Sequence, residues 1–260
     1  MPDSAQEVFA DGNAREISRD WVPEVPVALE FNGLAYAVMM ATPVDLQDFV
    51  QGFALTEGLA RSIDEIEQIA IAQTEKGWIA RAQLGGLGVE QLTERVRTRV
   101  AESSCGLCGI ENLEAVARPL PRVVAHEEAQ SEAIFAAVGA MRERQVLKRQ
   151  GGAAHGAGFA TLEGKVIEVR EDVGRHNAID KLIGALAESE RDIGTGIVIS
   201  TARCSYEIVE KVVRAGGTRL VTVSLPTSMA VERARSAGLS LVCLARDDSF
   251  LRIAAQGGRS

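Results

Sequence analysis

The stretch IVISTARCSYEIVEKVVRAGGTRLVTVSLPTSMAVERARSAGLSLVCL, residues 197–244, decides the fold of this chain. It holds three short apolar runs, residues 197–200, 220–224 and 241–244, separated by segments with helical periodicity. Runs that are apolar throughout are typical of strands covered on both faces, and parallel strands need crossover helices between them. The C-terminal half is therefore predicted to be α/β with a largely parallel sheet.

Upstream of this stretch the pattern changes to a hairpin and two helices. Phe159 to Leu162 and Lys165 to Val169 are predicted as short strands joined at Glu163-Gly164. A long helix is expected around Ser131 to Lys148, ended by Gly151-Gly152. A second helix follows the hairpin, with Ile179, Leu182, Ile183 and Leu186 on one face.

The N-terminal half opens with a second hairpin. Val25 to Phe31 and Leu34 to Met40 are predicted strands joined at Asn32-Gly33, a strong signal for a two-residue turn. Thr42-Pro43 is expected to open a helix, with Thr42 as its cap and Gly58 closing it. The apolar face of this helix holds Leu46, Phe49, Val50 and Phe53. This half is predicted to be a smaller α+β domain.

Three segments follow from these patterns. Residues 1–20 are polar without a period and are predicted to be a flexible arm. Residues 21–125 form the N-terminal α+β domain, whose last helix, with Val89, Leu92, Val96 and Val100 on one face, leads into a cysteine loop. Residues 126–260 form the C-terminal α/β domain.

The bulk properties exclude several classes of protein. A formal net charge of −8 argues against a broad nucleic-acid-binding surface, although a local basic pocket for one nucleotide is compatible with it. No apolar run reaches the roughly 18 residues that span a bilayer, and the N-terminus lacks the pattern of a secretory signal. Four cysteines, two of them three residues apart, do not form a disulfide framework. We therefore expect a cytoplasmic protein with no membrane or nucleic-acid partner.

Cys105 and Cys108, in the glycine-rich segment Ser104-Cys105-Gly106-Leu107-Cys108-Gly109, allow three interpretations. A structural zinc site needs four ligands, and a second Cys-x-x-Cys is absent. A thiol-disulfide enzyme would use both cysteines as a redox couple. A sulfur carrier needs one exposed, reactive thiolate in a mobile loop, which the flanking glycines and serines favour.

His126-Glu127-Glu128 also resembles the His-x-Glu of zinc deaminases. Its order relative to the cysteines is reversed, because in those enzymes the histidine comes first. A surface histidine is the alternative for His126, and no metal is expected.

Polar residues gather where the predicted strands of the C-terminal half end. Arg203, Thr227 and Arg246 follow three of these ends, where helix N-termini supply unpaired N–H groups that suit a phosphate. Ser205 and Thr227 can equally well cap their helices. Two further polar segments are 171–177, with Asp172, Arg175 and His176, and 152–156, with His155. These side chains either bind a ligand or stabilise the local turn.

Taken in order, these segments resemble the formate dehydrogenase accessory sulfurtransferase family (FdhD/NarQ) from about Glu24 to the C-terminus. The matching motifs are Glu24-Val25-Pro26-Val27 with Asn32-Gly33, Thr42-Pro43 to Gly58, Ser104 to Gly109, Gly152 to His155, Glu171 to Ala178, Ser205-Tyr206-Glu207 and Pro226-Thr227-Ser228.

The resemblance implies that Cys105 receives a persulfide from a cysteine desulfurase, assisted by Cys108, and passes the sulfur to the molybdenum bis-guanine-dinucleotide cofactor of formate dehydrogenase. It also implies a homodimer and a C-terminal domain of cytidine-deaminase-like topology without zinc. The residues implied to contact the cofactor are those of the closing segment, Phe250, Leu251, Arg252, Ile253, Ala254 and Ala255.

Overall fold

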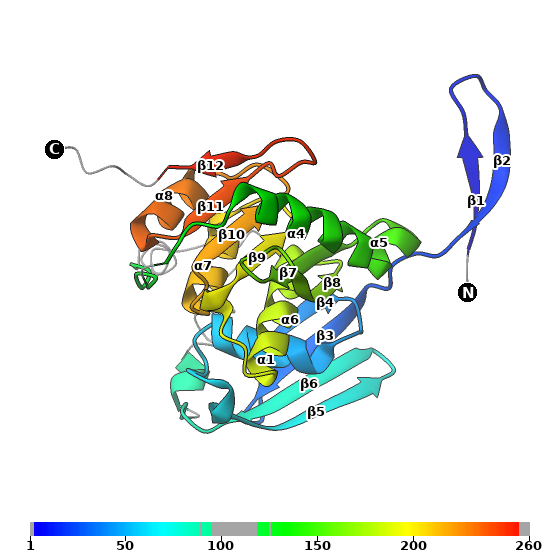
Figure 1. The fold of residues 1–260 in the computed structure, drawn as a ribbon. Helices are drawn as coiled ribbons and strands as arrows, with labels where there is room; N and C mark the ends of the chain where they lie inside the picture. The colour runs from blue at the N-terminus through cyan, green and yellow to red at the C-terminus, as the bar shows by residue number, and fades with distance from the viewer. Residues whose placement is uncertain (1–2, 89, 95–118, 125, 255–260) are drawn as a thin grey trace.

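The computed structural model describes residues 3–88, 90–94, 119–124 and 126–254. These residues form a four-stranded sheet, a six-stranded sheet and a separate two-stranded hairpin (Figure 1). The two larger sheets lie on either side of a pair of crossing helices, α1 and α6 (Figure 1). Within these residues no helix is both long enough and apolar enough to cross a membrane.

The four-stranded sheet has the order β4-β3-β6-β5. Its strands are β3 (Val25–Phe31), β4 (Leu34–Ala41), β5 (Ile66–Thr74) and β6 (Gly77–Leu84), with a single 3-10 turn, η1 (Ile63–Glu65), before β5. The predicted hairpin at Asn32-Gly33 is confirmed, and both turn residues have positive φ, as this tight turn requires.

Helix α1 (Leu46–Thr56) covers one face of this sheet. The four residues predicted for its apolar face are all buried, with Phe49 and Phe53 packed against the β3 side chains. The predicted start at Thr42 is wrong, since the helix begins four residues later. Thr42 makes no cap because its main chain and hydroxyl bond to Asp172, Val173 and Lys181 of the C-terminal half.

The six-stranded sheet has the order β12-β11-β10-β9-β7-β8. Its strands are β7 (His155–Ala160), β8 (Val166–Asp172), β9 (Ile197–Ser200), β10 (Arg219–Thr222), β11 (Ser240–Cys243) and β12 (Leu251–Ile253). The pairings of β9 with β10 and of β10 with β11 are parallel, as predicted, but the other three pairings are antiparallel. The sheet is mixed rather than largely parallel, because a hairpin closes one edge and the final strand folds back on the other.

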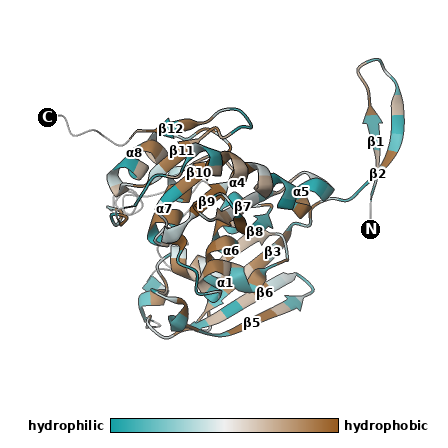
Figure 2. Ribbon diagram, viewed as in Figure 1, coloured by the Kyte–Doolittle hydropathy of each residue, from teal (hydrophilic) through white to brown (hydrophobic). Residues whose placement is uncertain are grey.

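Helices cover both faces of this sheet. On one face lie α6 (Arg175–Glu188), the turn η2 (Ile193–Thr195), α7 (Tyr206–Arg214) and α8 (Ser228–Ala237); on the other lies α4 (Ser131–Arg144). Along β9, Val198 packs on the first face, and Ile197 and Ile199 pack on the second. Figure 2 shows hydrophobic residues gathered where the helices meet the sheets. This two-sided burial explains why the strands are apolar throughout.

The long helix expected around Ser131 to Lys148 is divided in two. A second helix, α5 (Val146–Gly151), starts after a break at Gln145 and ends at Gly152, whose φ is positive. The Glu171 carboxylate accepts hydrogen bonds from the Leu147 and Lys148 N–H groups at 2.8 and 3.1 Å. This carboxylate takes up N–H groups that a continuous helix would bond internally, and so stabilises the break.

The first twenty residues were expected to lack regular structure, but they contain paired strands. Strand β1 (Asp3–Val8) pairs antiparallel with β2 (Ala14–Arg19), and the hairpin projects from the body (Figure 1). Ion pairing across the strands, such as Arg15 to Glu7, accompanies the main-chain bonds. Neither face of this hairpin is buried, so its sequence shows no alternation of apolar and polar residues from which the strands could be predicted.

The two halves meet where α1 crosses α6, and two glycines set the distance. A Cβ atom added at Gly52 would lie 1.7 Å from the Asp180 carbonyl oxygen, and one added at Gly184 would lie 2.0 Å from that of Asp48. The helix backbones are therefore in direct contact at this crossing, which only residues without a side chain permit. This contact fixes the position of α6 relative to α1. It therefore also positions the first residues of α6, which belong to the densest polar segment of the sequence.

Candidate functional site

The polar ends of the strands share one edge of the six-stranded sheet. Strands β8, β9, β10 and β11 run in the same direction, and β7 runs against them. Because β7 is reversed, its first residue, His155, lies opposite the last residue of β8, Asp172. This is the edge at which ligands collect in open α/β sheets.

Four basic side chains gather around His155 at this edge. Burial lowers the pKa of His155, and electrostatic interaction with Arg175, Lys148, His176 and Arg203 lowers it further. We call Lys148, His155, Arg175, His176 and Arg203 the cation cluster. A neutral imidazole surrounded by guanidinium and ammonium groups is an arrangement that favours an anion.

The start of α6 adds to this positive character. The N-cap residue of α6 is Gly174, which has no side chain. No side-chain oxygen of the cap residue therefore accepts from the first N–H groups of α6. The Nε2 atom of His176 lies 3.0 Å from the Glu207 carboxylate. The neighbouring His176 is the main cause of a lowered pKa for Glu207. Glu207 is therefore an anionic neighbour of His176 at the edge of the cluster.

Asp172 belongs to the same polar segment, but it faces the interior. Its side chain is fully buried, and Oδ2 accepts from Lys181 Nζ at 2.6 Å and from the Thr42 N–H at 3.0 Å. Oδ1 accepts from the Gly174 N–H at 2.7 Å and from Asn177 Nδ2 at 2.9 Å. Four donors occupy the carboxylate, so Asp172 ties the two halves together and is not available to a ligand.

Lys181→Met should destabilise the protein strongly, because it leaves the Asp172 carboxylate buried without its counter-charge. We expect a loss of about 3–5 kcal/mol of unfolding free energy, or roughly 10 °C in melting temperature for a chain of this size. Thermal melts followed by circular dichroism measure it. Lys76→Met, in the exposed β5–β6 turn, is the control and should change stability by less than about 0.5 kcal/mol. A Lys181→Met melting point within roughly 2 °C of wild type would contradict this role.

A second buried ion pair is formed by Asp180, the neighbour of Lys181 on α6. Lys211 Nζ lies 2.9 Å from Asp180 Oδ1 and donates to the Thr56 hydroxyl, also at 2.9 Å, and to Glu57 at 3.2 Å. Sequence reasoning missed this group, since Asp180 and Lys211 sit on amphipathic helices where charged residues normally face water. It is a further link between α1 and the C-terminal half.

The remaining strand-end residues divide between capping and exposure. Thr227 caps α8 by accepting from the Ala230 N–H at 3.2 Å, and Ser205 precedes α7 without a side-chain cap bond. Arg203 and Arg246 are exposed.

Cys204 is fully buried; its hydrogen bond with Cys243 and its burial raise the pKa of its thiol, so it is not a nucleophile. His126 is partly exposed, and its Nδ1 lies 2.9 Å from the Val124 carbonyl oxygen, which fits the surface interpretation.

The segment predicted to contact the cofactor forms the outermost strand on the side of the sheet away from β7 and β8. Phe250 packs on Phe135 with ring centroids 5.1 Å apart, and Arg252 lies over the Phe250 ring and pairs with Glu128. Leu251, Arg252 and Ile253 form β12, in which Leu251 is half exposed, and the Ala254 carbonyl accepts from Arg235. Within one chain, three strands separate β12 from β7, which carries His155, and two separate it from β9, which Arg203 follows.

Some predicted residues lie outside the described residues. They are Cys105, Cys108 and Ala255, together with most of the predicted helix between Val89 and Val100. The chain re-enters the described part at Pro119, and Leu120 then packs against the core of the C-terminal half.

Comparison with known proteins places the chain in a family. Residues 22–256 match the model of the FdhD/NarQ family. The chain is 42% identical over 235 residues to the sulfur carrier protein FdhD of Variovorax paradoxus (strain S110), covering 90% of this chain and 84% of that protein. It is also 42% identical over 223 residues to the sulfur carrier protein FdhD of Cupriavidus necator, covering 86% and 77%.

A solved structure supports the fold. The crystal structure of a formate dehydrogenase accessory protein from Desulfotalea psychrophila superposes with a TM-score of 0.78 at 21% identity, covering 98% of this chain and 97% of that one. The likeness extends over both sheets, so the mixed α/β arrangement is that of the solved protein. On the family match and the close relatives together, this chain is a member of the FdhD/NarQ family.

Proposed function

We propose that this protein is a sulfurtransferase that accepts sulfur on Cys105 from a cysteine desulfurase and passes it to the molybdenum bis-guanine-dinucleotide cofactor of formate dehydrogenase. The observation that carries the proposal is the 42% identity, over most of the chain, to proteins named sulfur carrier protein FdhD. The pair Cys105 and Cys108 supplies a thiol of the kind that such a role needs. The protein acts in the cytoplasm, as a homodimer.

Accepting sulfur requires one nucleophilic thiolate and no net oxidation. The Cys105 thiolate attacks the outer sulfur of the donor persulfide, the sulfur–sulfur bond of the donor breaks, and the donor cysteine leaves as a thiolate. A new sulfur–sulfur bond on Cys105 carries the transferred atom. Incubation with a cysteine desulfurase and cysteine should therefore add the mass of one sulfur atom to the intact protein, and a reductant should remove it. A protein whose mass stays unchanged under these conditions would refute the proposal.

The client cofactor carries phosphates, and the strand-end edge offers charges that suit them. The cation cluster and the uncapped start of α6 support phosphate binding there. The chain order of β7, β8, β9, β10 and β11 in the sheet supports the cytidine-deaminase-like topology. Because β12 lies at the far edge, contact by Phe250 to Ala255 with the same cofactor fits a dimer, in which two chains supply different parts of the site.

Guanosine diphosphate, a fragment of this cofactor, should bind through the strand ends near Arg203, Thr227 and Arg246 together with residues 250–255. We expect it to bind at least about tenfold more tightly than adenosine diphosphate, since polar groups that bond the guanine edge discriminate against another base. Titration calorimetry measures both affinities. Arg203→Gln should weaken both diphosphates about tenfold by removing a phosphate contact, whereas Arg15→Gln, in the projecting hairpin, should weaken neither. Equal affinity for the two nucleotides would leave only a generic anion site.

A further inference from the structure

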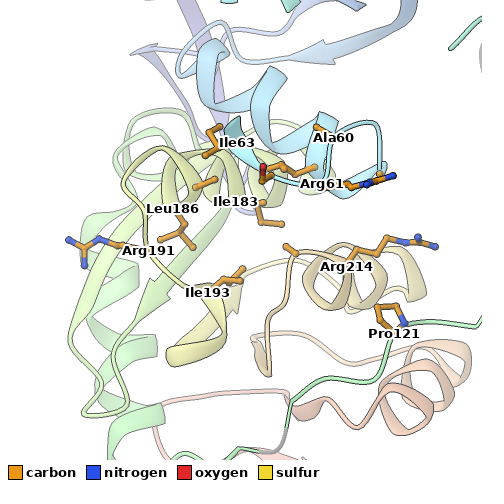
Figure 3. Close-up of a pocket in the computed structure, with 14 residues that line it drawn as sticks. Ala60, Arg61, Ile63, Pro121, Ile183, Leu186, Arg191, Ile193 and Arg214 are labelled. Carbon is orange, nitrogen blue, oxygen red and sulfur yellow. The ribbon is translucent and has the colours of Figure 1, made fainter. Parts of the chain in front are cut away.

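A cavity of about 440 Å³ opens at the end of α6 that lies away from the cation cluster (Figure 3). It is bounded by the last turns of α1, α6 and α7, by the loop that follows α1, and by Pro121. Helix α6 has 14 residues, so its two ends are about 21 Å apart. The cavity is therefore separate from the strand-end edge at which we place the cofactor phosphates.

The cavity has an apolar wall and a basic rim. Four branched side chains, Ile63, Ile183, Leu186 and Ile193, line its interior (Figure 3). Arg61, Arg191 and Arg214 are the charged residues of its lining, and no aspartate or glutamate is among the described residues that line it. An apolar hollow with a positive rim suits a ligand that is both apolar and acidic.

Two of the three arginines lie on the same side of the opening. In Figure 3 the side chains of Arg61 and Arg214 extend toward the side where Pro121 lies, whereas Arg191 extends the other way. Arg214 has one carboxylate near it, Glu210 at 3.6 Å, and Glu210 is also paired with Arg233. The Arg61 side chain forms no ion pair with any residue in the described part of the chain, and the Glu65 carboxylate accepts from the Arg61 main-chain N–H at 2.7 Å. Arg61 and Arg214 are thus the two basic side chains on the side of the opening where Pro121 lies.

The cavity also lies beside the point where the chain returns from its cysteine segment. Pro121 lines the cavity and comes two residues after Pro119, where the described chain resumes; Cys108 is thirteen residues before Pro121. A partner that binds here is held next to the attachment of the segment that carries Cys105. The position favours a protein that exchanges sulfur with Cys105 over a ligand of the strand-end edge.

We propose that this cavity docks the sulfur donor by receiving an acidic segment of the donor that carries a bulky apolar side chain. The apolar side chain fills the hollow between Ile63, Ile183 and Leu186, and a neighbouring carboxylate bonds to Arg61 and Arg214. Interfaces gain most of their affinity from such a buried apolar anchor, and the charged rim adds rate and orientation. This inference rests on the proposed sulfur-carrier function.

The test compares a protein donor with a small one. Persulfide loading is followed by intact-protein mass spectrometry, first with a purified cysteine desulfurase at increasing concentration and then with glutathione persulfide, which needs no docking site. The double variant Arg61→Glu/Arg214→Glu should need about tenfold or more desulfurase for half-maximal rate, and should load from glutathione persulfide as the wild type does. Ala187→Trp, which places an indole in the cavity mouth without a change of charge, should give the same pattern.

Arg191→Glu is the matched control, because it makes the same charge reversal on the side chain that points away. It should need no more than about twofold more desulfurase than the wild type. Unchanged desulfurase dependence in the double variant would overturn the docking proposal, and so would equal slowing with both donors, since that effect is not one of docking. If the wild type loads from neither donor, the sulfur-carrier function itself fails.

Discussion

Gly52→Ala should yield little or no soluble folded protein. The added methyl carbon would lie 1.7 Å from the Asp180 carbonyl oxygen, 2.6 Å from the carbonyl carbon and 2.8 Å from the Gly184 nitrogen. All three atoms belong to the backbone of α6, so no side chain can rotate away to make room. Relief requires α1 and α6 to separate, which pulls apart the buried bonds of Asp172 and Asp180 that join the same two halves.

The expected cost exceeds the roughly 1–3 kcal/mol typical of an overpacked site, and a domain has only about 5–15 kcal/mol to lose. Soluble yield and thermal melting by circular dichroism decide the outcome. Gly139→Ala is the control: it also lies within a helix, α4, but a Cβ there would meet nothing within 4 Å. That variant should be stabilised by about 0.5–1 kcal/mol. A Gly52→Ala protein that melts with the wild type would mean that the crossing is looser than described.

Cys105→Ala should abolish sulfur loading and activation of the client enzyme, whereas Cys108→Ala should still accept a persulfide. In Cys-x-x-Cys pairs the N-terminal thiol is commonly the exposed nucleophile, with its thiolate favoured by nearby N–H groups and by the second thiol. A carrier needs only this one thiolate, whereas a dithiol oxidoreductase must close a disulfide between the two. The pair of variants therefore separates these two mechanisms as well as the two residues.

Both variants would be incubated with desulfurase and cysteine and compared by intact mass and by activation of a sulfur-depleted formate dehydrogenase. Cys108→Ala is the matched control, since it removes the same thiol group from the same segment. The two remaining cysteines, Cys204 and Cys243, are fully buried and cannot substitute as acceptors. Normal loading of Cys105→Ala would exclude Cys105 as the carrier.

Short-range sequence patterns correctly predicted those elements of the fold that depend on neighbouring residues. The Asn32-Gly33 hairpin, the apolar face of α1 and the three parallel strands β9, β10 and β11 are all confirmed. Each depends on turn chemistry or on burial of one element, and both leave a periodic signal in the sequence. The pairing of β7 with β9 leaves no such signal, because strand order in a sheet depends on contacts between distant residues.

The polar segments were harder to assign for a related reason. Asp172 and His155 lie directly opposite each other in the β7–β8 pairing, yet Asp172 is saturated by buried donors and His155 belongs to the cation cluster. The role of Asp172 depends on Thr42, which is 130 residues away in the sequence, so the choice between ligand contact and structural support could not be made from the segment alone. Residues that support the site and residues that form it carry the same chemical groups.

The contact between α1 and α6 also restricts how genes of this family can recombine. Gly52 must face a particular backbone path near Asp180, and Thr42 and Thr56 must meet Asp172 and Lys211 from the other half. A crossover between divergent relatives at any position from 57 to 171 would join an α1 from one parent to an α6 from the other. Functional recombinant proteins of this family should therefore carry α1 and α6 from the same parent, even where their surface residues come from both parents.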